Sequence, residues 1–246
     1  MPLNLNNKKI IISAGASGIG WAITKICLSR GAIVYLCDID IKSLNKIKKH
    51  PLIKKRLFTY KCDASNEDEV SNFFNQVYKK TKKIDALINN VGVAGPTGTI
   101  EKLTSEDWEQ TLKINVISHF YFTKLAIPML KNNKGGSIIN ISSDLGLIAP
   151  DQRIYPNNNI KPITYSVVKT GILGLNRYLS TYWPKKVRSN AVCFGGVLNK
   201  QNKSFLKKFP SYFSIATKLI LKGNWNELGC KLNKIVVRPV KNFIKF

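Results

Sequence analysis

The chain has 246 residues, of which 44% are hydrophobic, and its 39 Lys and Arg against 14 Asp and Glu give a formal net charge of +25. This length fits one domain that buries enough surface to fold without staples. The five cysteines are scattered and lack any C-x-x-C pairing, which argues against a disulfide framework or a metal site and suits a reducing cytoplasm. The apolar stretches fall far short of the ~20 residues that a membrane span needs, so we expect a soluble, cytoplasmic protein with no membrane partner.

The positive charge is spread over the chain. Its lysines lie among many Asn and Ile residues, and no known nucleic-acid-binding motif accompanies them. The exception is the segment 199–246, which holds eleven Lys or Arg and one acid. A solvated basic surface explains this composition better than a nucleic-acid partner, which stays the weaker alternative.

Strand-like and helix-like segments alternate along the chain. Short β-branched or apolar runs predict six strands, at 8–13, 32–37, 56–62, 84–89, 136–142 and 187–194. Helices are expected from the glycine-rich turn to residue 29, after residue 38, after an N-cap at Asn66, from Thr104 or Ser105, and over 164–182. This alternation predicts an α/β fold with a parallel sheet, in which ligands bind at the carboxyl ends of the strands.

The first candidate site is the glycine-rich turn "SAGASGIG" between the first strand and the first helix. Backbone amides of such a turn can approach a pyrophosphate, whose charge the helix N-terminus stabilises. The spacing is not the commoner G-x-G-x-x-G, so the turn alone is weak evidence. The candidate cofactor contacts in it are Ser13, Gly15, Ser17, Gly18, Ile19 and Gly20.

Acidic and amide side chains follow the next strands. Asp38 ends the second strand, where a carboxylate can accept hydrogen bonds from adenosine ribose hydroxyls and repel a 2′-phosphate. NAD(H) is therefore favoured, with NADP(H) left open and a plain loop acid as the alternative. Asp63 either holds an adenine amino group or acts as an N-cap. In "NNVG", Asn90 is a candidate cofactor contact and Gly92 leaves room for a flat ligand, although turn chemistry also explains them.

The second candidate site is the pair Tyr165 and Lys169 in "YSVVK". Their i,i+4 spacing places both on one helix face, which is also what an ordinary amphipathic helix shows. A phenol has a pKa near 10, and a neighbouring ammonium together with an oxidised nicotinamide would lower it. Ser143 ends the fifth strand, where its hydroxyl can donate to an oxygen that gains negative charge.

Five motifs in order, "SAGASGIG", "NNVG", "LKINV", "INISSDLG" and "YSVVK", resemble the short-chain dehydrogenase/reductase (SDR) family over roughly residues 5–197. The resemblance implies a three-layer, doubly wound, Rossmann-like sheet of order 3-2-1-4-5-6, a nicotinamide cofactor and hydride transfer between it and a secondary alcohol or ketone. It implies a homodimer or tetramer. By position it makes Tyr165 the general acid/base, Lys169 its activator and a ribose ligand, Ser143 the substrate-oxygen ligand and Asn115 the support of a proton-relay water.

The chain also departs from that family. Ala14 stands where the first glycine is usual, and Phe194 replaces a proline before Val197, the expected carboxamide contact. The segment 149–159 is longer than usual and resembles the subset associated with sugar and flagellar-glycan pathways. It carries the candidate substrate ligands Asp151, Gln152 and Arg153, for which a solvent loop is the alternative.

These observations divide the chain into a dinucleotide-binding and catalytic domain, 1–198, and a basic, divergent segment, 199–246. The latter is expected to be a substrate-covering region or a disordered tail, and it leaves a seventh strand and the tetramer contacts in question. The sequence favours an NAD(H)-dependent oxidoreductase. The alternative is a degenerate, non-catalytic dinucleotide-binding relative, damaged at Ala14, Phe194 and the tail.

Overall fold

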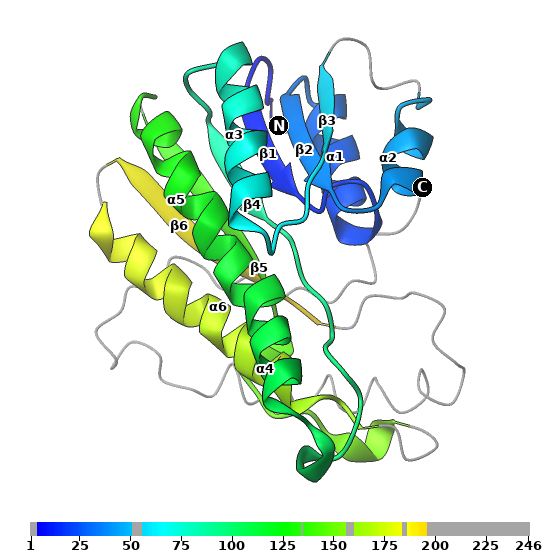
Figure 1. The fold of residues 1–246 in the computed structure, drawn as a ribbon. Coiled ribbons are helices and arrows are strands. Elements are labelled where there is room, and N and C mark those ends of the chain that lie inside the picture. The colour runs from blue at the N-terminus through cyan, green and yellow to red at the C-terminus, as the bar shows by residue number, and fades with distance from the viewer. Residues whose placement is uncertain (1–3, 51–55, 134, 156–159, 184–185, 196–246) are drawn as a thin grey trace.

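The structure, a computed structural model, describes residues 4–50, 56–133, 135–155, 160–183 and 186–195 (Figure 1). Strands and helices alternate along these residues, as the sequence predicts. The strands are β1 (Lys9–Ser13), β2 (Ile33–Asp38), β3 (Leu57–Lys61), β4 (Ala86–Asn89), β5 (Gly136–Ser143) and β6 (Val187–Phe194). The helices are α1 (Gly18–Ser29), α2 (Ile41–Ile47), α3 (Glu67–Lys80), α4 (Ser105–Leu112), α5 (Ser118–Lys131) and α6 (Ile163–Tyr182).

The six strands form one parallel sheet of order β3-β2-β1-β4-β5-β6. This order confirms the predicted doubly wound arrangement. Strands β2 and β3 are added on one side of β1, and β4, β5 and β6 on the other, so the strand order reverses between β1 and β4. Ligands of such sheets bind beyond the carboxyl ends of the strands at this switch point. Three predictions from the sequence fall outside the described residues: the doubtful seventh strand, the cofactor contact Val197 and the domain boundary at residue 198.

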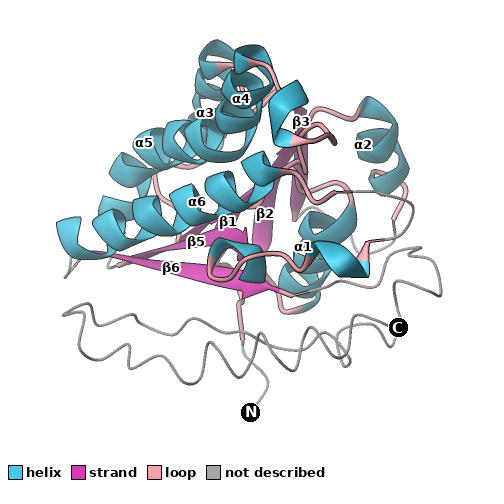
Figure 2. Cartoon of the chain, turned by 90° about the horizontal axis from the view of Figure 1, so that it is seen from below, coloured by secondary structure: helices cyan, strands magenta, loops and turns pink. Residues whose placement is uncertain are grey.

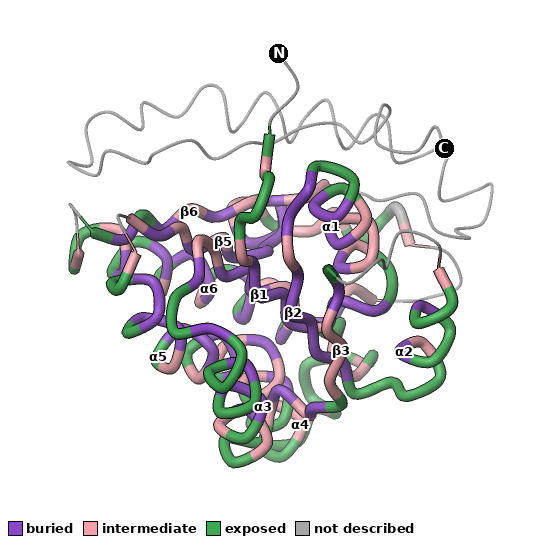
Figure 3. Tube along the Cα trace, turned by 90° about the horizontal axis from the view of Figure 1, so that it is seen from above, coloured by how far each residue is buried: buried purple, intermediate pink, exposed green. Residues whose placement is uncertain are grey.

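Helices cover both faces of the sheet (Figure 2). Side chains alternate along β1: Ile11 packs with Phe73 of α3 and Phe122 of α5, whereas Ile10 and Ile12 pack on the other face with residues of α1 and α2. Figure 3 shows the strands buried between helices whose outer sides are exposed. Because both faces are covered, the strands are almost continuously apolar, as is usual for parallel sheets.

Two helix starts agree with the predicted caps. The Asn66 side chain accepts hydrogen bonds from the amides of Asp68 and Glu69, which caps α3. Thr104, one of the two predicted choices, caps α4 in a reciprocal capping box with Asp107. The expected single long helix after residue 104 is instead interrupted by a π-helical turn, Lys113–Ile117, between α4 and α5.

A buried amide network ties the central strands together. The Asn89 amide donates to Asn140 Oδ1 at 2.9 Å, and the Asn140 amide donates to Asn176 Oδ1 at 3.1 Å and Ser189 Oγ at 3.3 Å. These contacts join β4, β5, β6 and α6 inside the protein. The amide nitrogens of Asn89 and Asn140 are thus satisfied, as buried polar groups usually are, whereas Asn89 Oδ1 has no hydrogen-bond partner.

Within the described residues, no helix is long and apolar enough to span a membrane. The same residues hold no cluster of three or more His, Cys, Asp or Glu side chains with the geometry of a metal site. Cys27, Cys37, Cys62 and Cys193 are free and buried.

Candidate active site

The glycine-rich turn places Ala14 in a conformation that suits glycine. Its φ is +49°, in the left-handed region that residues with a Cβ adopt at a cost of roughly 1–2 kcal/mol. The Ala14 carbonyl accepts a 2.9 Å hydrogen bond from the Asn90 side chain. A Cβ at Gly20 would lie only 2.1 Å from that carbonyl oxygen. The turn is therefore closely packed at Gly20, and the replacement of glycine at Ala14 is a real departure in the backbone.

The start of α1 fits a diphosphate. Ser17 occupies the N-cap position, yet its side chain makes no capping hydrogen bond and the first turn holds no acid. The helix thus begins with amide donors that no side chain of its own caps, next to two exposed residues, Ser17 and Gly18. Gly18 has φ +50°, and a Cβ there would meet nothing within 4 Å. Donors at a helix N-terminus and open space are what an anionic group needs.

Asp38 lies next to this turn and also holds it together. Its Oδ2 accepts from the Ala16 amide at 3.0 Å and its Oδ1 from the Asp40 amide at 3.0 Å. The residue is 7% exposed. Asp38 is therefore not a plain loop acid, the alternative considered from the sequence, but a carboxylate that stabilises the turn. Each of its oxygens keeps a lone pair that could accept a hydrogen bond from a ribose hydroxyl.

Three other predicted cofactor residues, Ser13, Ile19 and Asp63, are buried or half-buried. Asp63 Oδ1 accepts from the Ser65 amide and hydroxyl, an Asx turn ahead of α3, so it is not the cap of that helix. Ser13 is fully buried, and its hydroxyl accepts from the Asn90 amide at 3.0 Å. The Ser13 side chain therefore joins β1 to β4 and has no route to a ligand. Ile19 is half-buried in the first turn of α1.

Tyr165, Lys169 and Ser143 come together between α6 and the end of β5. Lys169 Nζ lies 5.6 Å from the centre of the Tyr165 ring, and the two residues share one face of α6. Ser143 is buried, and a hydrogen bond from its hydroxyl would stabilise the Tyr165 phenolate and lower its pKa. The structure thus brings the three predicted catalytic residues to one place.

Burial dominates the acid–base properties of this group. It lowers the pKa of Lys169 to about 8, with a second contribution from the charge of Lys161, so that the amine is mainly protonated at neutral pH. Burial also raises the pKa of Tyr165, against the hydrogen bond with Ser143. The predicted lowering of the Tyr165 pKa by Lys169 is therefore not found in the protein by itself, where desolvation disfavours the phenolate and raises the pKa.

Asn115 occupies the centre of the π-helical turn. Its Oδ1 accepts from the Val93 amide at 3.1 Å, and its Nδ2 donates to the Thr111 carbonyl at 3.0 Å. A Cβ on Gly92 would lie 2.9 Å from Lys169 Nζ and 3.1 Å from Asn115 Oδ1. Gly92, in the loop after β4, thus lets the backbone approach both side chains closely. π-helical turns are frequent at functional sites, and neither periodicity nor composition signals this one.

Two charged residues at the site were missed from the sequence. Lys161 Nζ lies 3.8 Å from the centre of the Tyr165 ring, closer than Lys169. Asp144 is buried and accepts a 2.8 Å hydrogen bond from Ser143 Oγ. Their sequence signal is proximity: Lys161 precedes Tyr165 by four residues, just ahead of α6, and Asp144 follows Ser143 directly.

The long segment after β5 satisfies most of its own polar groups. Arg153 Nε and Nη2 both donate to the Asp151 carboxylate at 2.8 Å, in an exposed ion pair. The Gln152 side chain bonds the backbone of Lys161 at both ends, at 2.8 and 3.2 Å. The predicted substrate ligands are therefore engaged with the segment itself.

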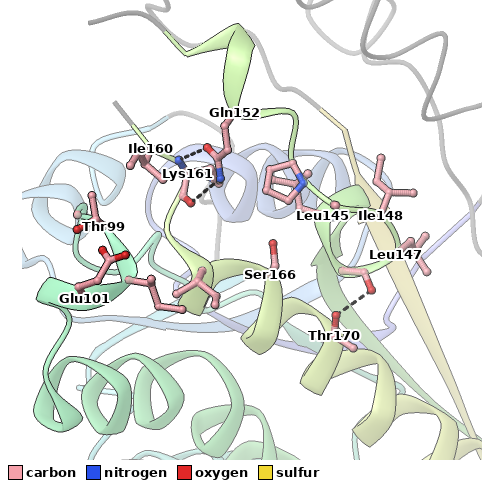
Figure 4. Close-up of a pocket in the computed structure, with 16 residues that line it drawn as sticks. Thr99, Glu101, Leu145, Leu147, Ile148, Gln152, Ile160, Lys161, Ser166 and Thr170 are labelled. Atoms are coloured by element: carbon pink, nitrogen blue, oxygen red, sulfur yellow. Dashed lines mark hydrogen bonds between the residues drawn. The ribbon is translucent and has the colours of Figure 1, made fainter. Parts of the chain in front are cut away.

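A pocket of about 810 Å³ lies beneath this segment (Figure 4). Its wall combines residues 98–101, residues 145–150 and the first turns of α6. Leu145, Leu147, Ile148 and Ile163 make much of it apolar. The Ser166 hydroxyl points into it and is buried with no hydrogen-bond partner. Leu145 also packs against Tyr165, so the pocket and the Tyr165 group share a wall.

The fold and this group of residues define a dinucleotide-binding protein of the SDR type. A family model described as enoyl-(acyl carrier protein) reductase matches residues 13–226. An uncharacterized oxidoreductase of Thermotoga maritima is 30% identical over 236 residues, covering 92% of this chain and 86% of the relative. The chain belongs to the short-chain dehydrogenase/reductase family, a family of oxidoreductases.

Two further matches show the breadth of the similarity. The post-translational flagellin modification protein A of Campylobacter coli is 29% identical over 209 residues, 82% of each chain. The crystal structure of a short-chain dehydrogenase from Leptospira borgpetersenii with bound NAD⁺ superposes with a TM-score of 0.70 at 26% identity, covering 82% of this chain and 76% of that one. The latter supports a nicotinamide dinucleotide as the cofactor class.

Proposed function

We propose that this protein transfers a hydride between NAD(H) and a secondary alcohol or ketone. The observation that carries the proposal is the meeting of Tyr165, Ser143 and the buried, mainly protonated Lys169 at the carboxyl edge of the sheet. A nicotinamide, when bound, supplies or accepts the hydride. Tyr165 gives its proton to the carbonyl oxygen in reduction and takes one from the hydroxyl in oxidation.

The other residues assist that proton transfer. The Lys169 ammonium stabilises negative charge on Tyr165, and Ser143 is placed to bind the substrate oxygen. Asn115 fixes the π-helical turn beside Lys169, consistent with support of a proton-relay water. We assign the pyrophosphate to the start of α1, with Gly15, Gly18 and Gly20 shaping the turn, the adenosine to Asp38 and Asp63, and the nicotinamide side to Asn90 and Gly92.

Titration with NADH and NADPH, followed by assays on an alcohol and ketone panel, tests this function. We expect NADH binding and turnover of at least one secondary alcohol or its ketone. Asp38→Ala should reduce the preference for NADH over NADPH. The matched variant Asp40→Ala, which removes the cap of α2, should leave that preference unchanged. An unchanged preference in Asp38→Ala would remove Asp38 from cofactor selection.

The left-handed Ala14 supports a second candidate, a dinucleotide-binding protein without turnover. Tight NADH binding with no activity on the panel would favour it. The Ala14→Gly variant distinguishes a distorted turn from an absent substrate, since restored activity in this variant points to the turn.

We propose an apolar flank on the substrate, because the pocket beside Tyr165 is largely apolar and its volume suits a small molecule. A polyhydroxylated, sugar-like substrate is the competing candidate. It has less support because Asp151 and Arg153 bind each other.

A series of 2-alkanones of increasing length, compared with ketoses, separates these two substrate classes. The expected gain in kcat/KM is about fourfold per added methylene, from roughly 0.8 kcal/mol of burial. Gly98→Phe should fill the pocket and abolish this gain, since a Cβ at Gly98 meets nothing within 4 Å. Gly98→Ala is the matched control. A flat series, or faster ketose reduction, would overturn the apolar assignment.

We further propose a cytoplasmic homodimer. Ile117 and Phe120, around the start of α5, and Val167 and Tyr178 of α6 are large apolar side chains that stay exposed. The π-helical turn that ends at Ile117 packs against α6, and Phe120 follows it in the first turn of α5, so these residues lie on neighbouring elements. Light scattering should give twice the mass of one chain. A Phe120→Glu, Val167→Glu double variant should then be monomeric, and a monomeric parent protein would refute the dimer.

A further inference from the structure

A buried carboxylate lies beside the proposed catalytic group and has no part in the mechanism above. Asp144 begins the 3-10 turn Asp144–Gly146 and is 4% exposed. Its Oδ1 accepts two hydrogen bonds of 2.8 Å, one from Ser143 Oγ and one from the Leu145 amide. A carboxylate this deeply buried is costly unless it is paired, so its position calls for a physical account.

The contact determines what Ser143 can do. A serine hydroxyl has one hydrogen, and here it is donated to Asp144. The Leu145 amide also reaches Ser143 Oγ, at 3.2 Å. While this bond is made, Ser143 can only accept a hydrogen bond from Tyr165 or a substrate. The hydrogen bond from Ser143 that would lower the pKa of Tyr165 needs the same hydrogen. Stabilising an oxygen that gains negative charge requires donation, so the ionised Asp144 competes with the substrate for the same hydrogen.

Asp144 also acts by its charge. Four titratable groups face it: Lys161 ahead of α6, Tyr165 on α6, Tyr155 after the Gln152–Ile154 turn, and Cys193 on β6. Lys161 is the cation of this set. Negative charge on Asp144 raises the pKa values of Tyr165, Tyr155 and Cys193, because it disfavours a second anion nearby.

We propose that Asp144 is a positioning residue that sets the direction of the Ser143 hydroxyl and the charge around Tyr165. As a carboxylate it holds the Ser143 hydrogen and opposes phenolate at Tyr165. As a neutral acid it holds that hydrogen less tightly, since hydrogen bonds to ionised groups are roughly twice as strong as neutral ones. The inference rests on the proposed function for its effect on turnover, but not for its effect on Tyr165.

The pH dependence follows from the position of the proton. Oδ1 already accepts two hydrogen bonds, so we place the added proton on Oδ2. Burial raises the pKa of Asp144 above its ordinary value, against the hydrogen bonds from Ser143 and Leu145 and the charge of Lys161. The fraction of neutral Asp144 therefore grows as the pH falls through this raised pKa, and kcat/KM should rise with it toward a plateau.

Asp144→Asn is the direct test, because it keeps the acceptor for Ser143 and Leu145 and removes the charge at every pH. The first readout is tyrosinate absorbance, with the Tyr165 signal isolated by subtracting the same protein carrying Tyr165→Phe. We expect the pKa of Tyr165 to fall in Asp144→Asn, because a nearby like charge is removed. This readout needs neither cofactor nor turnover.

The second readout is the pH profile of kcat/KM. We expect the wild-type value to fall up to tenfold per pH unit above the pKa of Asp144, and the Asp144→Asn value to stay level over that interval. Asp68→Asn, an exposed acid of α3, should behave as wild type. A Tyr165 titration and a profile unchanged by Asp144→Asn would overturn the inference, as would a uniform loss of activity without a change of profile. If the wild type shows no turnover, the proposed function fails, and the tyrosinate titration alone decides the role of Asp144.

Discussion

Lys161 Nζ lies 3.8 Å from the centre of the Tyr165 ring, whereas Lys169 Nζ lies 5.6 Å from it. The proposed acid/base thus lies between two lysines, Lys161 just ahead of α6 and Lys169 one helical turn after Tyr165. The charge of Lys161 contributes to the lowered pKa of Lys169, after burial. The nearer lysine therefore tunes the farther one as well as contacting the ring.

Removing this charge should move the alkaline limit of activity. In Lys161→Met the pKa of Lys169 should rise above about 8, so activity should persist to higher pH. Lys161→Arg keeps the charge and serves as the control. The pH profile of kcat/KM measures the shift. An alkaline limb at the same pH in both variants would show that Lys161 does not act on Lys169.

Replacing Ala14 by glycine should stabilise the protein. The change relieves roughly 1–2 kcal/mol of strain, because glycine adopts the left-handed conformation freely. It also lowers the stability by roughly 0.4–1 kcal/mol, because glycine raises the conformational entropy of the unfolded chain. We expect a net gain of about 1 kcal/mol in the free energy of unfolding, measured with urea. Ala16→Gly lacks the strain to relieve and should lose stability. Equal effects at the two positions would contradict the left-handed conformation of Ala14.

The buried amide network should be sensitive to single changes. Asn140→Leu removes one hydrogen bond each from Asn89, Asn176 and Ser189, while each of them keeps another partner. An intramolecular hydrogen bond contributes roughly 0.5–1.5 kcal/mol net to stability. We expect a loss of about 3 kcal/mol in the free energy of unfolding. Asn132→Leu, at an exposed site, should change it by less than about 0.5 kcal/mol. A similar, small effect in both would show that the network adds little.

His119 should make the protein sensitive to acid. Burial lowers its pKa to about 3, against an ordinary value near 6.5, and the charge of Lys169 adds to this. Between these two values the unfolded chain binds a proton that the folded protein does not. Stability should therefore fall as the pH drops from about 6.5 to about 3, by up to about 1.4 kcal/mol per unit.

Urea unfolding at several pH values, compared with His119→Gln, isolates this effect because the other groups titrate alike in both proteins. The variant should lose stability less steeply. Parallel curves would mean that His119 is protonated in the folded protein.

Much of the fold was predictable because it depends on local patterns. Apolar runs separated by helical periodicity fixed the strand positions, and Asn66 and the acids after it marked the start of α3. The π-helical turn around Asn115 was not predictable, since its sequence reads as continuous helix. The bounds of β4 also moved, from 84–89 to Ala86–Asn89, within the usual uncertainty of strand ends.

The candidate site was predictable where motifs carry it, at Tyr165, Lys169 and Ser143. Contacts that depend on the folded backbone were not. Asp38 holds the glycine-rich turn through the Ala16 amide, a contact across 22 residues. The sequence suggested that the side chains of the segment after β5 are available to bind a substrate. In the structure, however, the Gln152–Ile154 turn directs Asp151 and Arg153 toward each other.

The central claim is that Tyr165 transfers the proton in an NAD(H)-linked reaction. The most direct measurement is turnover by Tyr165→Phe together with its NADH affinity, on the best substrate of the wild type. We predict that turnover is lost by at least two orders of magnitude, as for removal of a general acid/base, while the NADH affinity stays within a few-fold. Turnover close to the wild-type rate would contradict the claim.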